Sequence, residues 1–169
     1  MDNRDKAVSD RRPELPDDPD DLAGPRSLPL HFQPQAIALV FVGGALGTLA
    51  RYSVEETLPH TSPGWPWATF AINLVGALVL GSVLEGLARL GADTGWRRRA
   101  RLLAGTGLCG AFTTYSTLAL EADTLGRDGH SAIGVIYAIT SVLAGVVAAW
   151  AGITIASNLH RWRRTERQS

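Results

Sequence analysis

The sequence contains one cysteine among 169 residues, and several long parts of it contain no charged residue at all. The single cysteine, Cys109, excludes a disulfide framework and a multi-cysteine metal site. The four histidines are scattered, and the sequence offers no nucleophile paired with a base and no phosphate-binding loop. We therefore expect no enzymatic activity.

Four stretches without Asp, Glu, Lys or Arg are long enough to cross a membrane. They cover residues 32–50, 65–84, 102–120 and 131–159. A helix rises about 1.5 Å per residue and the hydrocarbon layer is about 30 Å thick, so about 20 apolar residues suffice. The first stretch is marginal, but the flexible stem of Arg51 can reach the headgroups, so its helix should continue past Tyr52. The sequence predicts an all-α integral membrane protein with four transmembrane helices.

The two ends of the chain differ from this apolar body. Residues 1–31 contain eight acidic residues, five basic residues and five prolines, with almost nothing apolar to bury. This composition predicts a disordered tail rather than a cleaved leader. We expect a four-helix transmembrane domain over residues 32–160 and a short basic tail over residues 161–169.

Positive charge is concentrated on two segments that flank the apolar stretches. These segments contain Arg97, Arg98, Arg99 and Arg101, and then Arg161, Arg163, Arg164 and Arg167. With four crossings both segments lie on one side, and the positive-inside rule makes that side the cytoplasm. We therefore expect a multi-pass protein of the cell membrane with both termini cytoplasmic. Because topology explains the arginines, no nucleic-acid partner is expected.

Polar and small residues inside the apolar stretches indicate where helices meet. Gly43 and Gly47 are spaced to let another helix approach closely. An amide in mid-membrane, such as Asn73, must bond either to another helix or to something in a wet cavity. Residues 105–117 contain three glycines and five Ser or Thr residues, which disfavour a continuous helix. We expect a break there, where protein, water or an ion satisfies the freed backbone; the alternative is a kinked helix with only a structural role.

Three motifs in these stretches resemble those of the CrcB/Fluc fluoride channel family, over roughly residues 35–159. They are Gly43-Gly44 with Gly47, Arg51 and Tyr52; Asn73-Leu74-Val75-Gly76 with Gly81; and the run from Gly107 to Thr117, followed by Glu121. The third motif is the specific one. The resemblance implies an antiparallel dimer of four-helix subunits, each with its third helix broken near the middle, that lets fluoride leave the cytoplasm passively.

The resemblance also implies roles for individual residues. Backbone carbonyls of Gly110 and Thr113 would bind a structural sodium ion at the centre of the dimer. Arg51 would attract anions to the pore mouth or the dimer centre; its plain alternative is an interface anchor. The residues expected along the fluoride path are Asn73, Tyr115 and Leu118, with the hydroxyl groups of Thr114, Ser116, Thr117 and Ser141. A small, strongly hydrated anion needs such close donors and the positive edge of an aromatic ring.

Two features depart from the family pattern. Tyr115 and Leu118 stand where the family has phenylalanines, so either one pore is weakened or a ring comes from another subunit. The arginine bias also argues against insertion in both orientations, which leads us to expect a heterodimer with a homologous, oppositely oriented subunit.

Two other functions fit a small four-helix membrane protein. A dual-topology multidrug or cation transporter needs a carboxylate inside the membrane, whereas Glu85 and Glu121 lie at the ends of their stretches. A membrane scaffold without transport would leave Asn73 and the Thr-rich segment unexplained.

Overall fold

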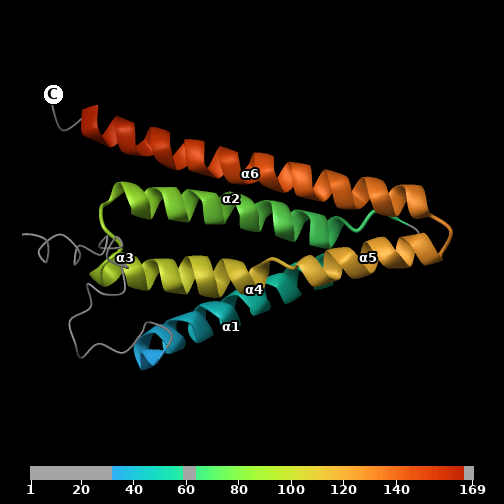
Figure 1. The fold of residues 1–169 in the computed structure, drawn as a ribbon, viewed down its shortest axis with the longest axis horizontal. Coiled ribbons are helices and arrows are strands. Elements are labelled where there is room, and N and C mark those ends of the chain that lie inside the picture. The colour runs from blue at the N-terminus through green and yellow to red at the C-terminus, as the bar shows by residue number, and fades with distance from the viewer. Residues whose placement is uncertain (1–31, 59–63, 166–169) are drawn as a thin grey trace, which may run out of the picture. The chain divides into compact units, whose positions relative to one another are not determined.

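The computed structural model describes residues 32–58 and 64–165, and the described residues form helices and no strands. The helices belong to one compact unit that begins at Pro34 (Figure 1). They are α1 (Pro34–Thr57), α2 (Trp67–Arg89), α3 (Gly95–Ala100), the π-helix η2 (Arg101–Cys109), α4 (Gly110–Phe112), α5 (Tyr115–Arg127) and α6 (Ser131–Thr165). The acidic tail predicted over residues 1–31 lies outside the described residues. The all-helical fold class is confirmed.

Three helices of the described residues are long and apolar enough to cross a membrane. They are α1, α2 and α6 as far as Trp162. Helix α1 continues through Arg51 and Tyr52 to Thr57, as the sequence predicts. Helix α6 also continues into the segment predicted as a basic tail, because it ends only at Thr165. The third charge-free stretch differs from these, since it is divided among η2, α4 and α5.

Two extended residues separate α4 from α5. Helix α4 ends at Phe112, and Thr113 and Thr114 have ψ angles of 153° and 119°, far from helical values. Both residues are β-branched, which lowers their preference for a helix and raises it for extended backbone. Figure 1 shows the resulting link as a short non-helical turn of the chain between two nearly collinear helices.

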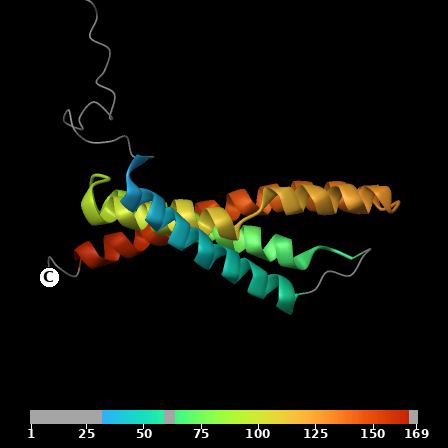
Figure 2. The same ribbon diagram turned by 90° about the horizontal axis from the view of Figure 1, so that it is seen from below.

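Helix α1 crosses η2 and α4 at very close range (Figure 2). A Cβ atom on Gly47 would lie 3.0 Å from the Phe112 backbone nitrogen and closer still to the Leu108 carbonyl. Gly43 meets the same helix at the Leu103 carbonyl, and a Cβ on Gly107 would lie 2.8 Å from a carbonyl oxygen of α1. The predicted packing role of Gly43 and Gly47 is therefore confirmed.

Helix α6 packs along both α2 and α5. Gly81 of α2 lies against the Ala149 carbonyl, and Gly152 of α6 lies against α2 in return. At one end of this pair Ser157 donates to the Glu85 carboxylate over 3.1 Å and accepts from Arg89 over 2.9 Å. In the interrupted segment, η2 and α4 pack mainly on α1, and η2 also contacts α2, whereas α5 packs mainly on α6.

Candidate functional site

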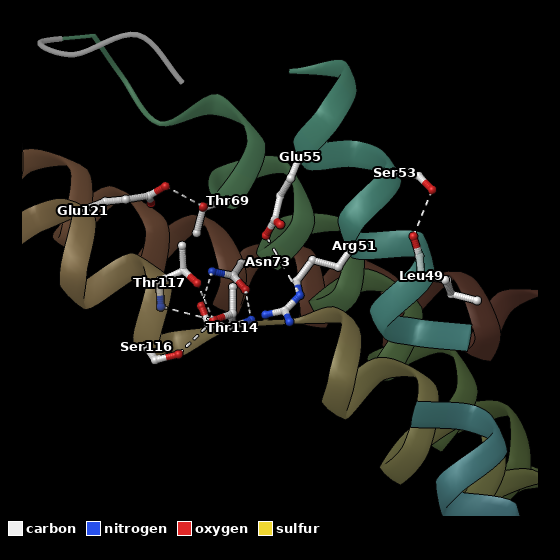
Figure 3. A network of polar contacts seen from close by, with 10 residues as sticks. All are labelled: Leu49, Arg51, Ser53, Glu55, Thr69, Asn73, Thr114, Ser116, Thr117 and Glu121. Atoms are coloured by element: carbon white, nitrogen blue, oxygen red, sulfur yellow. Dashed lines mark hydrogen bonds and ion pairs between the residues drawn. The ribbon is translucent and has the colours of Figure 1, made fainter. Parts of the chain in front are cut away.

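The side chain of Asn73 holds the break between α4 and α5. Its Nδ2 donates to the Thr114 carbonyl over 3.0 Å, and its Oδ1 accepts from the Thr114 N–H over 2.8 Å (Figure 3). Buried backbone polar groups need partners, and here one amide side chain satisfies both groups of one residue. One helical turn further along α2, Gly76 has no side chain, which makes room for the methyl group of Thr113. Of the two possibilities for Asn73, the structure shows the bond to another helix, and this bond uses only one of its two Nδ2 hydrogens.

The break also diverts the helical donors of two carbonyl groups, those of Gly110 and Thr113. In a continuous helix the Thr114 N–H would bond to the Gly110 carbonyl, and the Thr117 N–H to the Thr113 carbonyl. Instead the first donates to Asn73, and the second donates to the Thr114 hydroxyl over 3.2 Å. Gly110 is exposed, and nothing lies within 4 Å of where its Cβ would be. These are the two carbonyls to which the family resemblance gives a structural sodium ion.

Helix α5 begins at the break with Thr114 as its N-cap residue. The N–H groups of Tyr115 and Ser116 belong to the first turn and have no carbonyl partner within the helix. The Thr114 hydroxyl lies 3.0 Å from that of Thr117 and 3.2 Å from that of Ser116. This end of α5 therefore combines free N–H donors, three hydroxyl groups and the positive end of a helix dipole.

A groove of about 400 Å³ opens beside the break. Its walls are Asn73, Thr113, Thr114, Tyr115, Leu118, Ser141, Val142, Gly145, Val146 and Ala149. The structure thus brings together six residues predicted for the site, and it places Arg51, Gly110, Ser116 and Thr117 outside the groove walls. Tyr115 is 81% exposed, whereas Leu118 is 8% exposed and contributes an apolar wall.

Ser141 supplies an unusual polar group to this groove. The residue is 7% exposed, and its hydroxyl has no hydrogen-bond partner among the residues that the structure describes. A buried hydroxyl of this kind points to water or an ion as its partner. Gly145 lies one turn further along α6 and also lines the groove. Because glycine has no side chain, nothing projects into the groove at this position.

A second polar cluster lies about two helical turns beyond the break. Glu121 of α5 accepts hydrogen bonds from the hydroxyl of Thr69 over 2.8 Å and from that of Tyr137 over 2.7 Å. Both donors are almost fully buried, and the Trp65 ring packs edge-on against Tyr137 at 5.3 Å. Two hydroxyl groups thus solvate a carboxylate that would otherwise be unfavourable in an apolar surrounding.

The two clusters form one continuous polar track. Thr69 precedes Asn73 by four residues, Glu121 follows Thr117 by four, and Tyr137 precedes Ser141 by four, so each pair shares a helix face. The sequence places Glu121 after the third motif, at the end of its charge-free stretch, and Thr69 was missed. The spacing of four from Asn73 was the signal that could have found Thr69.

Arg51 approaches this region from α1. In Figure 3 its guanidinium extends from α1 toward the Asn73–Thr114 contact. Glu55 is its ion-pair partner at 4.0 Å, the outer limit for such a pair. The Arg51 side chain is 29% exposed, so its charge is only partly screened by solvent.

Comparison with known proteins agrees with this arrangement. Residues 38–153 match the family described as CrcB-like protein, Camphor Resistance (CrcB). The chain belongs to the CrcB family. The matched region includes α2, the break and the whole polar track. With three helices that are long and apolar enough to cross a membrane, this CrcB-family chain is a multi-pass membrane protein.

Several relatives of this CrcB-family chain carry a functional name. The chain is 49% identical over 118 residues to "Fluoride-specific ion channel FluC 1" of Cutibacterium acnes, which covers 70% of this chain and 82% of the relative. It is 44% identical over 131 residues to "Fluoride-specific ion channel FluC 2" of Leifsonia xyli, covering 78% and 90%. It is 40% identical over 123 residues to "Fluoride-specific ion channel FluC" of Chlorobium luteolum, covering 73% and 93%.

Proposed function

We propose that this chain is a subunit of a fluoride channel of the cell membrane, through which fluoride leaves the cytoplasm passively. The observation that carries this proposal is the pair of hydrogen bonds between Asn73 and the Thr114 backbone. That contact opens the helix beside a groove of about 400 Å³ and turns the start of α5 toward it. The names of relatives at 40–49% identity support the choice of ion.

The groove supplies donors suited to fluoride. A small, strongly hydrated anion needs close N–H and O–H groups to replace lost water, and helix N-termini attract anions. The second Nδ2 hydrogen of Asn73, the Ser141 hydroxyl and the first N–H groups of α5 provide such donors. The edge of the Tyr115 ring adds a positive partial charge. Leu118 offers no donor and serves as an apolar wall.

In this proposal η2, α4 and α5 together make the third of four crossings. Non-helical backbone at membrane depth is stable only where protein groups hydrogen-bond to it or where it lines a wet cavity. Asn73 supplies such hydrogen bonds to the backbone of Thr114. The start of α1, helix α3 and the end of α6 lie at one end of the helix bundle in Figure 1. This end contains the arginine-rich helix α3 and the arginine-rich end of α6, and the positive-inside rule assigns it to the cytoplasm.

The channel is an antiparallel dimer, with a sodium ion bound where two breaks meet. The residues present fit a hard cation, because Gly110 and Thr113 offer carbonyl oxygens whose helical donors are diverted. Gly110 and Thr113 would hold the cation through these carbonyls, and further oxygen ligands would come from an oppositely oriented partner. When bound, the cation supplies a fixed positive charge between the subunits.

The partner in this dimer is a homologous chain of opposite orientation. Eight arginines on one side give this chain a single preferred orientation. A second copy would therefore not insert into the membrane with the opposite topology. Leu118 also leaves the groove without a second ring, which a partner can supply. Measuring the sidedness of terminal tags tests this arrangement, and an even split between the two orientations would exclude it.

The channel is tested by efflux from vesicles. The chain is reconstituted alone and with a homologous subunit, and fluoride and chloride release are followed with ion-selective electrodes. Selective fluoride release from either preparation supports the proposal. Proton-coupled uptake of organic cations would instead indicate a transporter, and silence of both preparations would contradict a channel.

A further inference from the structure

The connection between α2 and α3 is a compact turn that gathers arginine side chains. Gly91 and Gly95 have φ angles of 119° and 56°, which other residues rarely adopt. The Arg97 Nε donates to the Ala92 carbonyl over 2.7 Å, and the Arg101 Nε donates to the Asp93 carboxylate over 2.9 Å. Hydrogen bonds to the turn thus hold the Nε atoms of Arg97 and Arg101 in place.

A cavity of about 140 Å³ lies between this turn and the end of α2. One wall is apolar and consists of Leu84, Leu87 and Ala88. The opposite wall consists of Gly91, Asp93, Arg97 and Arg101. The cavity therefore joins an apolar surface to a charged one within a single small volume.

The charge around this cavity is strongly positive. Residues 91–101 contain four arginines and one aspartate, which leaves a net charge of four minus one, or +3. Glu85, the nearest acid on α2, is already paired with Arg89 at 2.6 Å and contributes no compensation. Arg97 uses its Nε for the Ala92 carbonyl, so its two Nη groups project past Gly91 along the cavity wall.

The cavity also lies at the level of the membrane surface. Helix α2 is apolar enough to cross a membrane and ends at Arg89, directly before the turn. Trp96 lies in α3, directly after the turn, and is 58% exposed. Tryptophan concentrates at the boundary between hydrocarbon and headgroups. The leucines of the lining belong to the apolar helix α2, and the arginines follow the end of that helix.

We propose that this cavity is a binding site for the phosphate group of an anionic phospholipid. Arg97 and Arg101 hold the phosphate through charge-assisted N–H bonds, for which the guanidinium fork is well suited. Leu84 and Leu87 contact the upper part of an acyl chain. Asp93 remains paired with Arg101 and keeps that guanidinium in position. A basic pocket beside a membrane helix is a common form of headgroup recognition.

The test measures binding of phosphatidylglycerol to the full-length protein in phosphatidylcholine nanodiscs, by native mass spectrometry. Arg97→Gln should weaken binding about fivefold, the size expected for one cation near an anionic lipid surface. Arg99→Gln is the matched control, because it removes the same charge from outside the cavity walls. Arg97→Lys keeps the charge without the fork and should give an intermediate loss. An unchanged thermal midpoint shows that each variant is folded.

Three results would overturn the proposal. Equal losses for Arg97→Gln and Arg99→Gln would mean that general surface charge, and no defined site, attracts the lipid. Displacement of the lipid by soluble glycerol phosphate would assign the cavity to a soluble anion. A gain of similar size on deletion of residues 1–31 would identify the acidic tail as the occupant. A loss confined to the Arg97 variants, unaffected by both treatments, supports the lipid site.

Discussion

The two parts of the interrupted segment pack in different ways. Before the break, η2 and α4 lie against α1 through backbone contacts at Gly43, Gly47 and Gly107. After the break, α5 contacts α2 and α6 through hydrogen bonds from Thr69 and Tyr137 to its Glu121 side chain. Before the break, glycines let the helix backbones touch directly. After the break, polar side chains form the contacts between helices.

In the proposed channel, this difference separates a supporting part, formed by η2 and α4, from a polar part, formed by α5 and its partners. In lipid, helices associate by close packing, and small residues give the tightest contact without leaving room for water. Polar side chains inside a membrane protein instead mark wet or ion-carrying surfaces. The π-helix η2 belongs to the supporting part, where Gly107 allows the backbone of α1 to approach closely. In the proposed channel, the polar track lines the fluoride path.

The largest effect is expected at the junction of the two parts. Asn73→Ala removes both partners of the Thr114 backbone, and each unsatisfied buried group costs about 1–3 kcal/mol. The free energy of unfolding in detergent micelles should fall accordingly, and fluoride efflux should be lost. Asn158→Ala removes the same amide from the exposed end of α6 and should change neither measurement. Equal behaviour of the two variants would contradict the role given to Asn73.

A smaller effect is expected within the polar part. Tyr137→Phe keeps the buried ring against Trp65 but deletes the hydroxyl that donates to Glu121. Loss of a hydrogen bond to a carboxylate should lower the free energy of unfolding by about 1.5–3 kcal/mol. Tyr52→Phe, on an exposed face of α1, is the control and should be neutral within error. A neutral Tyr137→Phe variant would show that this hydroxyl does not stabilise the cluster.

The supporting part is tested with an added methyl group. Gly47→Ala places a Cβ against the backbone of η2, and such overpacking should lower the free energy of unfolding by about 1–3 kcal/mol. Gly86→Ala makes the same change where nothing lies within 4 Å, and should stabilise α2 by about 0.4–1 kcal/mol. Opposite signs for two identical substitutions would support the close-packed contact, and matching signs would refute it.

The smallest effect is expected on the outer face of α5. Asp123 and Arg127 form an ion pair at 2.7 Å, but their side chains are 53% and 79% exposed. Exposed pairs one turn apart contribute about 0.5 kcal/mol or less. Asp123→Asn should therefore leave both thermal stability and fluoride efflux nearly unchanged. A large loss would mean that this face contacts a partner subunit.

Much of this architecture follows from simple features of the sequence. Charge-free stretches predict α1, α2 and α6, since length and hydropathy alone decide whether a helix can span. The spacing of Gly43 and Gly47 predicts a close helix contact. Composition also indicates a weak helix over residues 105–117, because glycine and threonine both lower helix stability there.

Other features required the three-dimensional arrangement. The two-residue length of the break depends on Asn73, which lies 41 positions away and replaces the lost helical partners of Thr114. The burial of Leu118 and the exposure of Tyr115 follow from how α5 packs on α6. Thr69 was missed because a single threonine in an apolar helix is ordinarily a packing residue; its spacing of four from Asn73 is a weak signal, and its contact with Glu121 gives it a role.

The most direct test of the account is whether fluoride comes to the break. Backbone and side-chain amide resonances of the nitrogen-labelled protein, in nanodiscs and assembled with its partner where required, are followed by NMR during titration with fluoride and with chloride. The account predicts that fluoride shifts the amides of Tyr115, Ser116 and the Asn73 side chain, while chloride at the same concentration does not. Absence of a shift at these three amides, or equal shifts with both ions, would contradict it.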